Sequence, residues 1–139
     1  KAGLDRLNIF EGHVIPKEII PPASSQGVIA IQSTENKKNQ YEKDLNNYLT
    51  NLNDINTFYE TLAERSFLSE LDGSCKSPIS SSAYIVDNDY LLLYGAVANL
   101  DGTKVIKSEI KGLKQDAVLL GKELSKEIMI KSNGEIIYK

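Results

Sequence analysis

The sequence predicts an α+β fold in which a three-stranded antiparallel sheet is covered on one face by helices. Three short apolar runs follow one another at residues 83–87, 90–98 and 104–110. Compact turns separate them, and turns of this kind join antiparallel neighbours in a sheet. Helical patterns precede and follow the three runs. From about residue 53 the expected order is therefore α-β-β-β-α, which lets two helices cover one face of the sheet.

The first part of the chain does not predict a complete domain. Residues 2–9 are typical of the end of a helix, and prolines at positions 16, 21 and 22 exclude a long helix after it. Residues 27–33 have the β-branched composition of a buried strand. A strand that is apolar on both faces needs neighbours, and the sequence offers none for it. We therefore expect residues 1 to about 35 to be a piece of a larger unit whose beginning is missing.

Two helices are expected between this piece and the sheet. The first, at 41–52, has apolar residues on one face of a 3.6-residue period: Tyr41, Leu45, Tyr48, Leu49 and Leu52. The second runs from the N-cap Asp54 to about residue 71. Its expected core face is Ile55, Phe58, Tyr59, Leu62, Phe67 and Leu71. Gly73 is suited to a left-handed cap at its end.

A last helix is expected at about 115–130. Its inward residues are Ala117, Leu120, Leu124 and Ile128, and Asp116 in the first turn suits the positive end of the helix dipole. The polar tail after Lys131 is expected to fray.

Composition narrows the classes of function. The 139 residues carry a net charge of -3 with scattered lysines, so neither a nucleic acid nor an anionic membrane finds a basic face. One cysteine and one histidine, His13, cannot close a zinc site, and a single cysteine forms no internal disulfide. No apolar run approaches the ~20 residues of a membrane span, and no signal peptide is visible. We expect a cytoplasmic protein.

Cys75 stands in a turn of glycine and serine directly after the second helix. A lone cysteine is most often a small buried hydrophobe. A nucleophilic cysteine needs a base, and His13 lies far off in the proline-rich connector, which disfavours Cys-His catalysis. A third interpretation is an attachment point, which requires access and flexibility but no paired base.

Residues 62–83, LAERSFLSELDGSCKSPISSSA, resemble the cofactor-attachment segment of the porphobilinogen deaminase family. That family shows Ala-Glu-Arg, a later Leu, then Gly-Gly-Cys, a short spacer and Pro-Ile. Residues 2–7, AGLDRL, and 21–32, PPASSQGVIAIQ, agree in order and spacing with two further motifs. LDGTKVIKSEIKG and KQDAVLLGKEL are similar to the hairpin and final helix of the family's third domain.

The resemblance implies a transferase, hydroxymethylbilane synthase, which joins four porphobilinogen molecules into hydroxymethylbilane and releases ammonia. It also implies a dipyrromethane cofactor held by a thioether to Cys75. The family's catalytic aspartate lies in a part that this chain lacks, so no catalytic residue is assigned here and the chain alone is expected to be inactive. The complete enzyme is expected to be a monomer.

The family has three domains, and the resemblance implies how this chain divides among them. Residues 1–20 match the end of the second domain. Residues 21–50 match a strand and helix of the first domain and its connection. Residues 51–139 match the C-terminal cofactor-attachment domain.

Two further positions transfer from the resemblance. Arg6 matches an arginine that contacts cofactor or substrate carboxylates, which a guanidinium fork suits. Gln26 matches a cleft glutamine near the cofactor. Arg6 could instead be an exposed helix-end residue, and Gln26 a polar residue at the start of a strand.

Other polar residues near these motifs are interpreted as structural. Glu64 and Arg65 are expected to form an ion pair, and the serines at 77–82 to be solvated turn and the start of a strand. The chain departs from the family at Ser74 and at Ser24-Ser25, where the family has glycine before the cysteine and an apolar-Gly pair. Serine fits those places only if the backbone does not need positive φ.

A different class of function stays open beside the transferase. A stand-alone α+β interaction module could share the fold and carry no cofactor. The presence or absence of a covalent pyrrole adduct discriminates the two.

Overall fold

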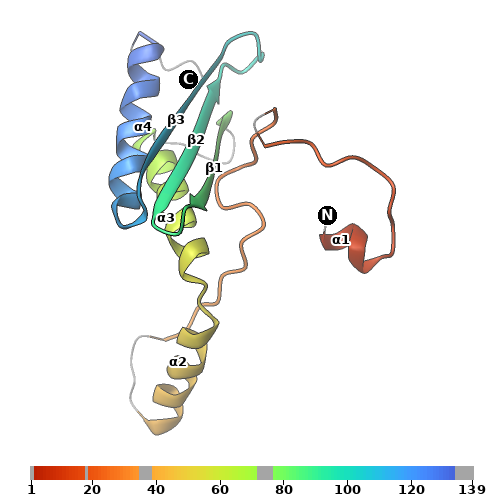
Figure 1. The fold of residues 1–139 in the computed structure, drawn as a ribbon, viewed down its shortest axis with the longest axis vertical. Helices are drawn as coiled ribbons and strands as arrows, with labels where there is room; N and C mark the ends of the chain where they lie inside the picture. The colour runs from red at the N-terminus through yellow and green to blue at the C-terminus, as the bar shows by residue number, and fades with distance from the viewer. Residues whose placement is uncertain (1, 18, 35–38, 72–76, 134–139) are drawn as a thin grey trace.

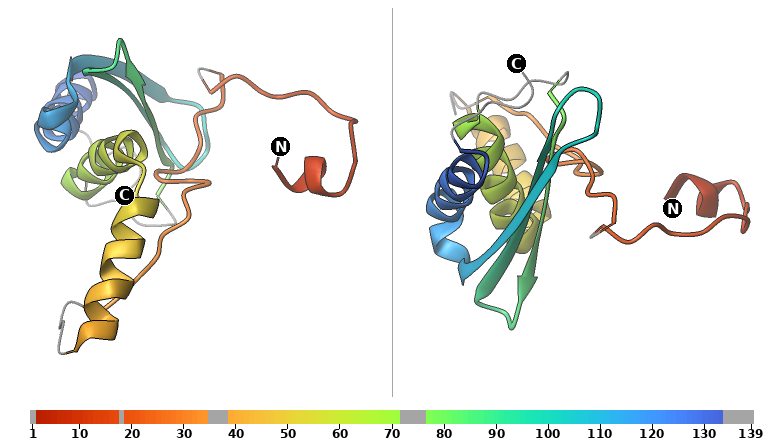
Figure 2. Two further views of the ribbon diagram at one scale, coloured as in Figure 1. Left: turned by 60° about the horizontal axis from the view of Figure 1, so that its bottom comes forward. Right: turned by 90° about the horizontal axis from the view of Figure 1, so that it is seen from above.

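The computed structural model describes residues 2–17, 19–34, 39–71 and 77–133. Its centre is a three-stranded antiparallel sheet of order β1-β2-β3, formed by β1 (Ile79–Val86), β2 (Tyr90–Ala98) and β3 (Val105–Leu113). Helices α3 (Ile55–Glu70) and α4 (Ala117–Lys131) cover one face of the sheet (Figures 1 and 2). The predicted α+β fold is confirmed.

Both connections of the sheet are compact turns, as predicted. Between β1 and β2, Asp87 and Asn88 have positive φ angles of 54° and 62°, which these side chains tolerate better than most. Between β2 and β3, Gly102 has a φ of 72° and donates its amide to the carbonyl of Asn99. These turns fix the register in which Val86 pairs with Tyr90 and Ala98 with Val105.

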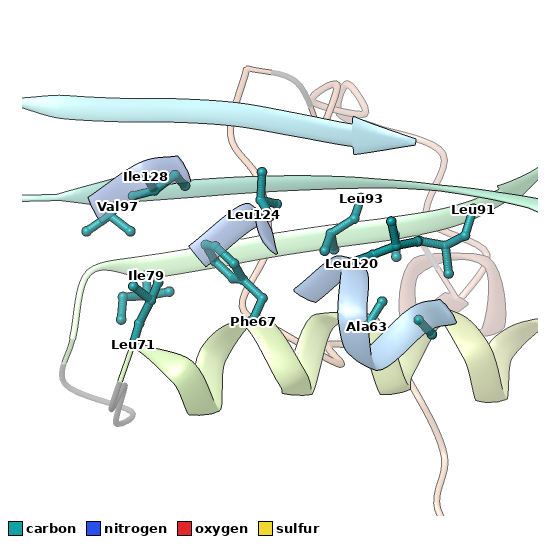
Figure 3. Close-up of a cluster of buried hydrophobic side chains, with 12 residues drawn as sticks. Ala63, Phe67, Leu71, Ile79, Leu91, Leu93, Val97, Leu120, Leu124 and Ile128 are labelled. Atoms are coloured by element: carbon teal, nitrogen blue, oxygen red, sulfur yellow. The ribbon is translucent and has the colours of Figure 1, made fainter. Parts of the chain in front are cut away.

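The core lies between the two helices and the sheet (Figure 3). All four residues predicted for the inner face of α4 are buried: Ala117, Leu120, Leu124 and Ile128. Phe67 of α3 is fully buried and lies against Gly95, where an added Cβ would stand 2.6 Å from the phenyl Cζ. At the helix crossing, a Cβ on Gly121 would stand 2.7 Å from the carbonyl oxygen of Ala63. Glycine is therefore required for α3 and α4 to approach this closely.

Two boundaries in the sheet differ from the prediction. β1 begins at Ile79 rather than residue 83, and β3 continues to Leu113 rather than 110. Ser81 and Ser82 are buried within β1, so the interpretation of residues 77–82 as solvated is wrong for these two. Strand pairing with β2 supplies backbone partners along all of β1, which polar composition alone does not indicate. A single 3₁₀ turn, Lys114–Asp116, then leads from β3 into α4.

Helix α2 (Gln40–Leu52) forms where it was predicted, but its apolar face is uncovered. Asn39 caps it by accepting a hydrogen bond from the amide of Glu42 at 2.9 Å. No residue of α2 is buried, and Tyr41 and Tyr48 are 73% and 71% exposed. The predicted N-cap Asp54 of α3 is confirmed, with the amide of Thr57 donating to its carboxylate at 2.7 Å.

Gly27 ends a turn, and residues 28–33 form neither a helix nor a strand of the sheet. The prediction of a buried strand is therefore wrong for this structure, and Ile29 is 91% exposed. The physical reason is the absence of a neighbour: within the described ranges no other strand lies beside this segment to complete a ladder. The short helix α1 (Ala2–Arg6) stands at the far end of the N-terminal segment, away from the sheet (Figures 1 and 2).

Candidate functional site

The predicted anchor, Cys75, lies outside the described residues, as does Ser74. The structure does describe the two ends between which it falls. Leu71 closes α3 and is 5% exposed, and Ile79 opens β1 and is 8% exposed. The carbonyl of Pro78 accepts the amide of Ala98 at 2.9 Å. Both ends are thus held by the core, one by a helix and the other by the sheet.

Residues 22–25, here called the docked turn, lie against the outer edge of β1. The amide of Ser81 donates to the carbonyl of Pro22 at 3.2 Å. The hydroxyls of Ser24 and Ser81 are 2.6 Å apart. The amide of Ser25 donates to the carboxylate Oε2 of Glu64 on α3 at 2.5 Å. The docked turn is therefore tied to both elements that flank residues 72–76.

Glu64 is a buried carboxylate, 9% exposed, that accepts two backbone amides. Its Oε2 takes the amide of Ser25, and its Oε1 takes that of Ala83 at 2.7 Å. Burial raises the pKa of the Glu64 carboxyl, the two amides and Lys17 act against that rise, and Glu60 adds to it. Desolvation therefore disfavours the ionised carboxylate by more than the two amides and Lys17 favour it.

The expected ion pair between Glu64 and Arg65 is wrong. Neighbouring residues on a helix point about 100° apart, so their side chains do not face each other. Arg65 is exposed, whereas Glu64 points towards β1 and is held by backbone amides.

Gln26 follows the docked turn directly and is exposed. Its side-chain oxygen Oε1 accepts the amide of Ala23 at 3.2 Å, so the side chain folds back over the turn. Ser25 has a φ of 63°, in the left-handed region that a residue with a Cβ adopts only at a cost. The hydroxyl of Ser25 is buried and has no hydrogen-bond partner in the part of the chain that the structure describes.

A groove of about 740 Å³ opens beside Gln26. One wall is the segment from Gly27 to Ser33, and the other is the end of α2 with the first half of α3. The polar side chains along it include Gln26, Arg65 and Thr61, and the Thr61 hydroxyl is buried without a partner among the described residues. The groove is thus lined by both apolar and polar side chains.

Arg6 is exposed at the end of α1. Figures 1 and 2 show α1 far from the sheet and from the docked turn. The structure therefore does not bring Arg6 together with Gln26.

The described residues contain neither a cluster of metal-ligating side chains nor a helix that could span a membrane. No three His, Cys, Asp or Glu side chains in these ranges gather where they could hold a metal ion. No helix there is long and apolar enough to cross a membrane.

Sequence reasoning missed the role of Glu64, although a signal was present. Glu64 stands beside Ala63, on a helix surface that continues to the buried Phe67. Glu60 precedes it by one turn, and its carboxylate accepts the amide of Ile85 at 2.9 Å. A carboxylate beside an apolar helix face needs hydrogen-bond donors when it is buried, and unpaired backbone amides are one source of them.

Comparisons with known proteins agree on one family. The family model described as the C-terminal domain of porphobilinogen deaminase matches residues 58–130. A porphobilinogen deaminase from Prochlorococcus marinus is 38% identical over 139 residues, which are 98% of this chain and 42% of that protein. One from Geobacillus sp. is 35% identical, covering 84% of this chain and 37% of its own length. One from Campylobacter lari is 36% identical, with 98% and 43% covered. The chain thus spans less than half the length of these relatives.

Proposed function

The chain belongs to the porphobilinogen deaminase family, and from this premise we propose that it forms the C-terminal, cofactor-carrying part of a hydroxymethylbilane synthase. The complete enzyme joins four porphobilinogen molecules into hydroxymethylbilane and releases ammonia. The observation that carries the proposal is the family-model match over residues 58–130, a range that includes Cys75.

In this proposal Cys75 holds a dipyrromethane cofactor through a thioether, and Gln26 and Arg6 contact the cofactor or the substrate carboxylates. The residues present fit such a group. Cys75 is the one thiol in the sequence. Gln26 and Arg65 line the same groove and present an amide and a guanidinium to it. When bound, the cofactor supplies the pyrrole to which the substrate units are joined.

In this proposal the chain contributes by holding the cofactor and orienting it towards the substrate. Covalent attachment at Cys75 keeps an acceptor beside the incoming substrate at high effective concentration. The carbon-sulfur bond of a thioether also persists in a reducing cytoplasm, where we place the protein, while a disulfide would not. Arg6 and Gln26 supply a cation and an amide for acidic side chains. Arg6 reaches such a site only if α1 lies elsewhere in the complete enzyme.

The division among three domains is part of the proposal. Residues 1–20 are assigned to the second domain, 21–50 to the first, and 51–139 to the C-terminal domain. The uncovered apolar side chains before residue 50 support this assignment, since Leu7, Phe10 and Ile29 are 68%, 84% and 91% exposed. Segments of that kind need a partner surface. We further propose that the complete enzyme is a monomer with neither nucleic acid nor membrane as partner.

Intact mass is the test of the attachment. The chain is expressed joined to a complete N-terminal portion and purified, and its mass is compared with that of the Cys75→Ser variant. A covalent adduct of two pyrrole units that Cys75→Ser removes is the expected result, and an Ehrlich-type colour reaction gives a faster first answer. Unmodified protein would favour the other reading, an α+β interaction module without cofactor.

The 139-residue chain alone is expected to consume no porphobilinogen. The reaction needs a carboxylate to stabilise positive charge that develops on a pyrrole nitrogen. No Asp or Glu of this chain falls in the family's catalytic motif. Measurable consumption by the purified chain would contradict this assignment.

A further inference from the structure

The edge of β1 is closed by groups from outside the sheet. Three of its amides point away from β2, and each has an acceptor. Ser81 donates to the carbonyl of Pro22, Ala83 to Glu64, and Ile85 to Glu60. An edge strand normally leaves such amides to solvent or to another chain. Here one acceptor comes from the docked turn and two from a single face of α3.

Glu64 differs from Glu60 in one respect that matters. Among the described residues, the carboxylate of Glu60 accepts one backbone amide, that of Ile85 on β1. That of Glu64 takes two amides from segments far apart in sequence, Ser25 of the docked turn and Ala83 of β1. A carboxylate has two acceptor oxygens and can bridge two donors, whereas a glutamine amide has only one. Because the two amides meet different oxygens of Glu64, a glutamine in the same place would present an acceptor oxygen to only one of them.

We propose that Glu64 is a positioning residue whose carboxylate joins the docked turn to β1 and so fixes Gln26 relative to α3 and β1, the two elements that flank residues 72–76. The meaning of that position for a cofactor rests on the proposed function, but the bridge itself does not.

Two further contacts hold the docked turn against β1 beside the Glu64 bridge. They are the hydrogen bond to the carbonyl of Pro22 and the pair of hydroxyls of Ser24 and Ser81. Gln26 comes next in the chain and is bonded back to Ala23. Its place is therefore set by residues 22–25, and the charged member of their contacts is Glu64.

The primary experiment follows amide signals of the 139-residue chain by NMR as pH is lowered. An amide bonded to a carboxylate shifts when that carboxylate takes up a proton. We expect the Ser25 and Ala83 signals to move with one common midpoint. The charged groups that face Glu64 are Glu60 and Lys17. The Ile85 amide, which is bonded to the Glu60 carboxylate and not to Glu64, is the reference signal.

Glu64→Gln should abolish the common titration and speed the exchange of the Ser25 amide about 10- to 100-fold, the equivalent of one charge-assisted hydrogen bond. The backbone ¹⁵N heteronuclear NOE of Gln26 should fall with it. Glu60→Gln is the matched control, one turn earlier on α3: it should change Ile85 and leave Ser25 and Gln26 as they were.

Separate midpoints for Ser25 and Ala83, or no titration of either signal, would overturn the bridge. An unchanged Gln26 in Glu64→Gln would overturn the positioning role. Loss of protection at the buried amides of Leu91 and Leu93 would show that Glu64→Gln fails to fold. In that case the wild-type titration still decides the bridge. Glu64→Asp then replaces the variant, because it keeps the charge but its shorter side chain should release the Ser25 amide. Loss of the proposed cofactor attachment at Cys75 would alter none of these signals, so the two proposals fail separately.

Discussion

At the scale of single residues, Glu64 is a buried carboxylate whose hydrogen-bond partners are backbone amides. Its pKa is raised because burial outweighs the two amides that it accepts. Such a carboxylate destabilises the fold when ionised, compared with the same group protonated. It is retained where its geometry does something that an apolar residue cannot, which here is to satisfy two backbone donors at once.

The pH dependence of stability follows from that shift. A raised folded-state pKa gives a contribution that is fully present below the unfolded-state pKa and is lost as pH rises through the folded-state pKa. The difference in unfolding free energy between the wild type and Glu64→Gln should therefore fall as pH rises through this window. Urea denaturation at several pH values measures it, with Glu60→Gln as reference. A difference that grows with pH would mean that the amides outweigh burial.

Ser25 offers a second test at the residue scale. Its φ of 63° costs a residue with a Cβ roughly 1 kcal/mol or more, and glycine escapes that cost. Ser25→Gly should stabilise the docked turn by up to about 1 kcal/mol, seen as slower exchange of the Ser81 amide. Ser24→Gly is the control, because it removes the hydroxyl bonded to Ser81 and should speed that exchange. Faster exchange in both variants would contradict the strain at Ser25.

Among the elements, burial was predictable where a partner lies in the chain, and it was wrongly expected for residues 27–33, which have no such partner in the described structure. The inner face of α4 follows the 3.6-residue period because the sheet lies beneath it, and all of its predicted members are buried. Residues 27–33 have strand composition but lack a neighbour in the described structure, so composition alone was a wrong guide. In β1 the serines concealed a buried strand. Pairing with β2 supplies partners for the strand backbone, and the hydroxyl of Ser24 pairs with that of Ser81, whereas the buried Ser82 hydroxyl has no partner among the described residues.

The candidate site was predictable only in part for the same reason. The motif around Cys75 drew attention to the right segment, but residues 72–76 lie outside the described structure. The role of Glu64 depends on a contact 39 residues away in sequence, which no local pattern encodes.

The crossing of α3 and α4 makes a prediction at the element scale. A Cβ on Gly121 would meet backbone atoms, the Ala63 carbonyl oxygen and the Phe67 nitrogen, both at 2.7 Å. Gly121→Ala must push the helices apart, at a cost of about 1–3 kcal/mol or more. Gly112→Ala is the control: its nearest neighbour is the end of the Leu120 side chain, which can rotate away. Chemical denaturation should rank Gly121→Ala as clearly the less stable.

At the scale of the whole molecule the chain divides into a closed core and an open N-terminal part. All the buried hydrophobic residues of the described structure lie between Ala63 and Ile128. The residues before α2 expose Leu7, Phe10, Val14 and Ile29. Stability of the chain should therefore come almost entirely from its second half.

A truncated chain tests this division. Residues 53–133 should fold alone, because both faces of their core, helix and sheet, lie within that range. Phe67→Ala in this unit should cost about 3–5 kcal/mol through the cavity that it leaves. Amide exchange gives the check, with β2 well protected in the truncated and the full chain. Exchange of β2 as fast as that of residues 27–33 in the full chain would place the boundary elsewhere.

The contacts of the docked turn also affect the order in which the chain folds. The two turns of the sheet close between near neighbours, whereas the Ser24–Ser81 contact closes a separation of 57 residues. The entropy of closing a loop rises with its length, so the sheet should assemble before residues 22–25 settle on its edge. During synthesis residues 22–25 leave the ribosome before β1 does, and they can dock only after β1 has formed. Glu64→Gln should then accelerate unfolding and leave the folding rate nearly unchanged, a pattern that stopped-flow measurements in urea can resolve.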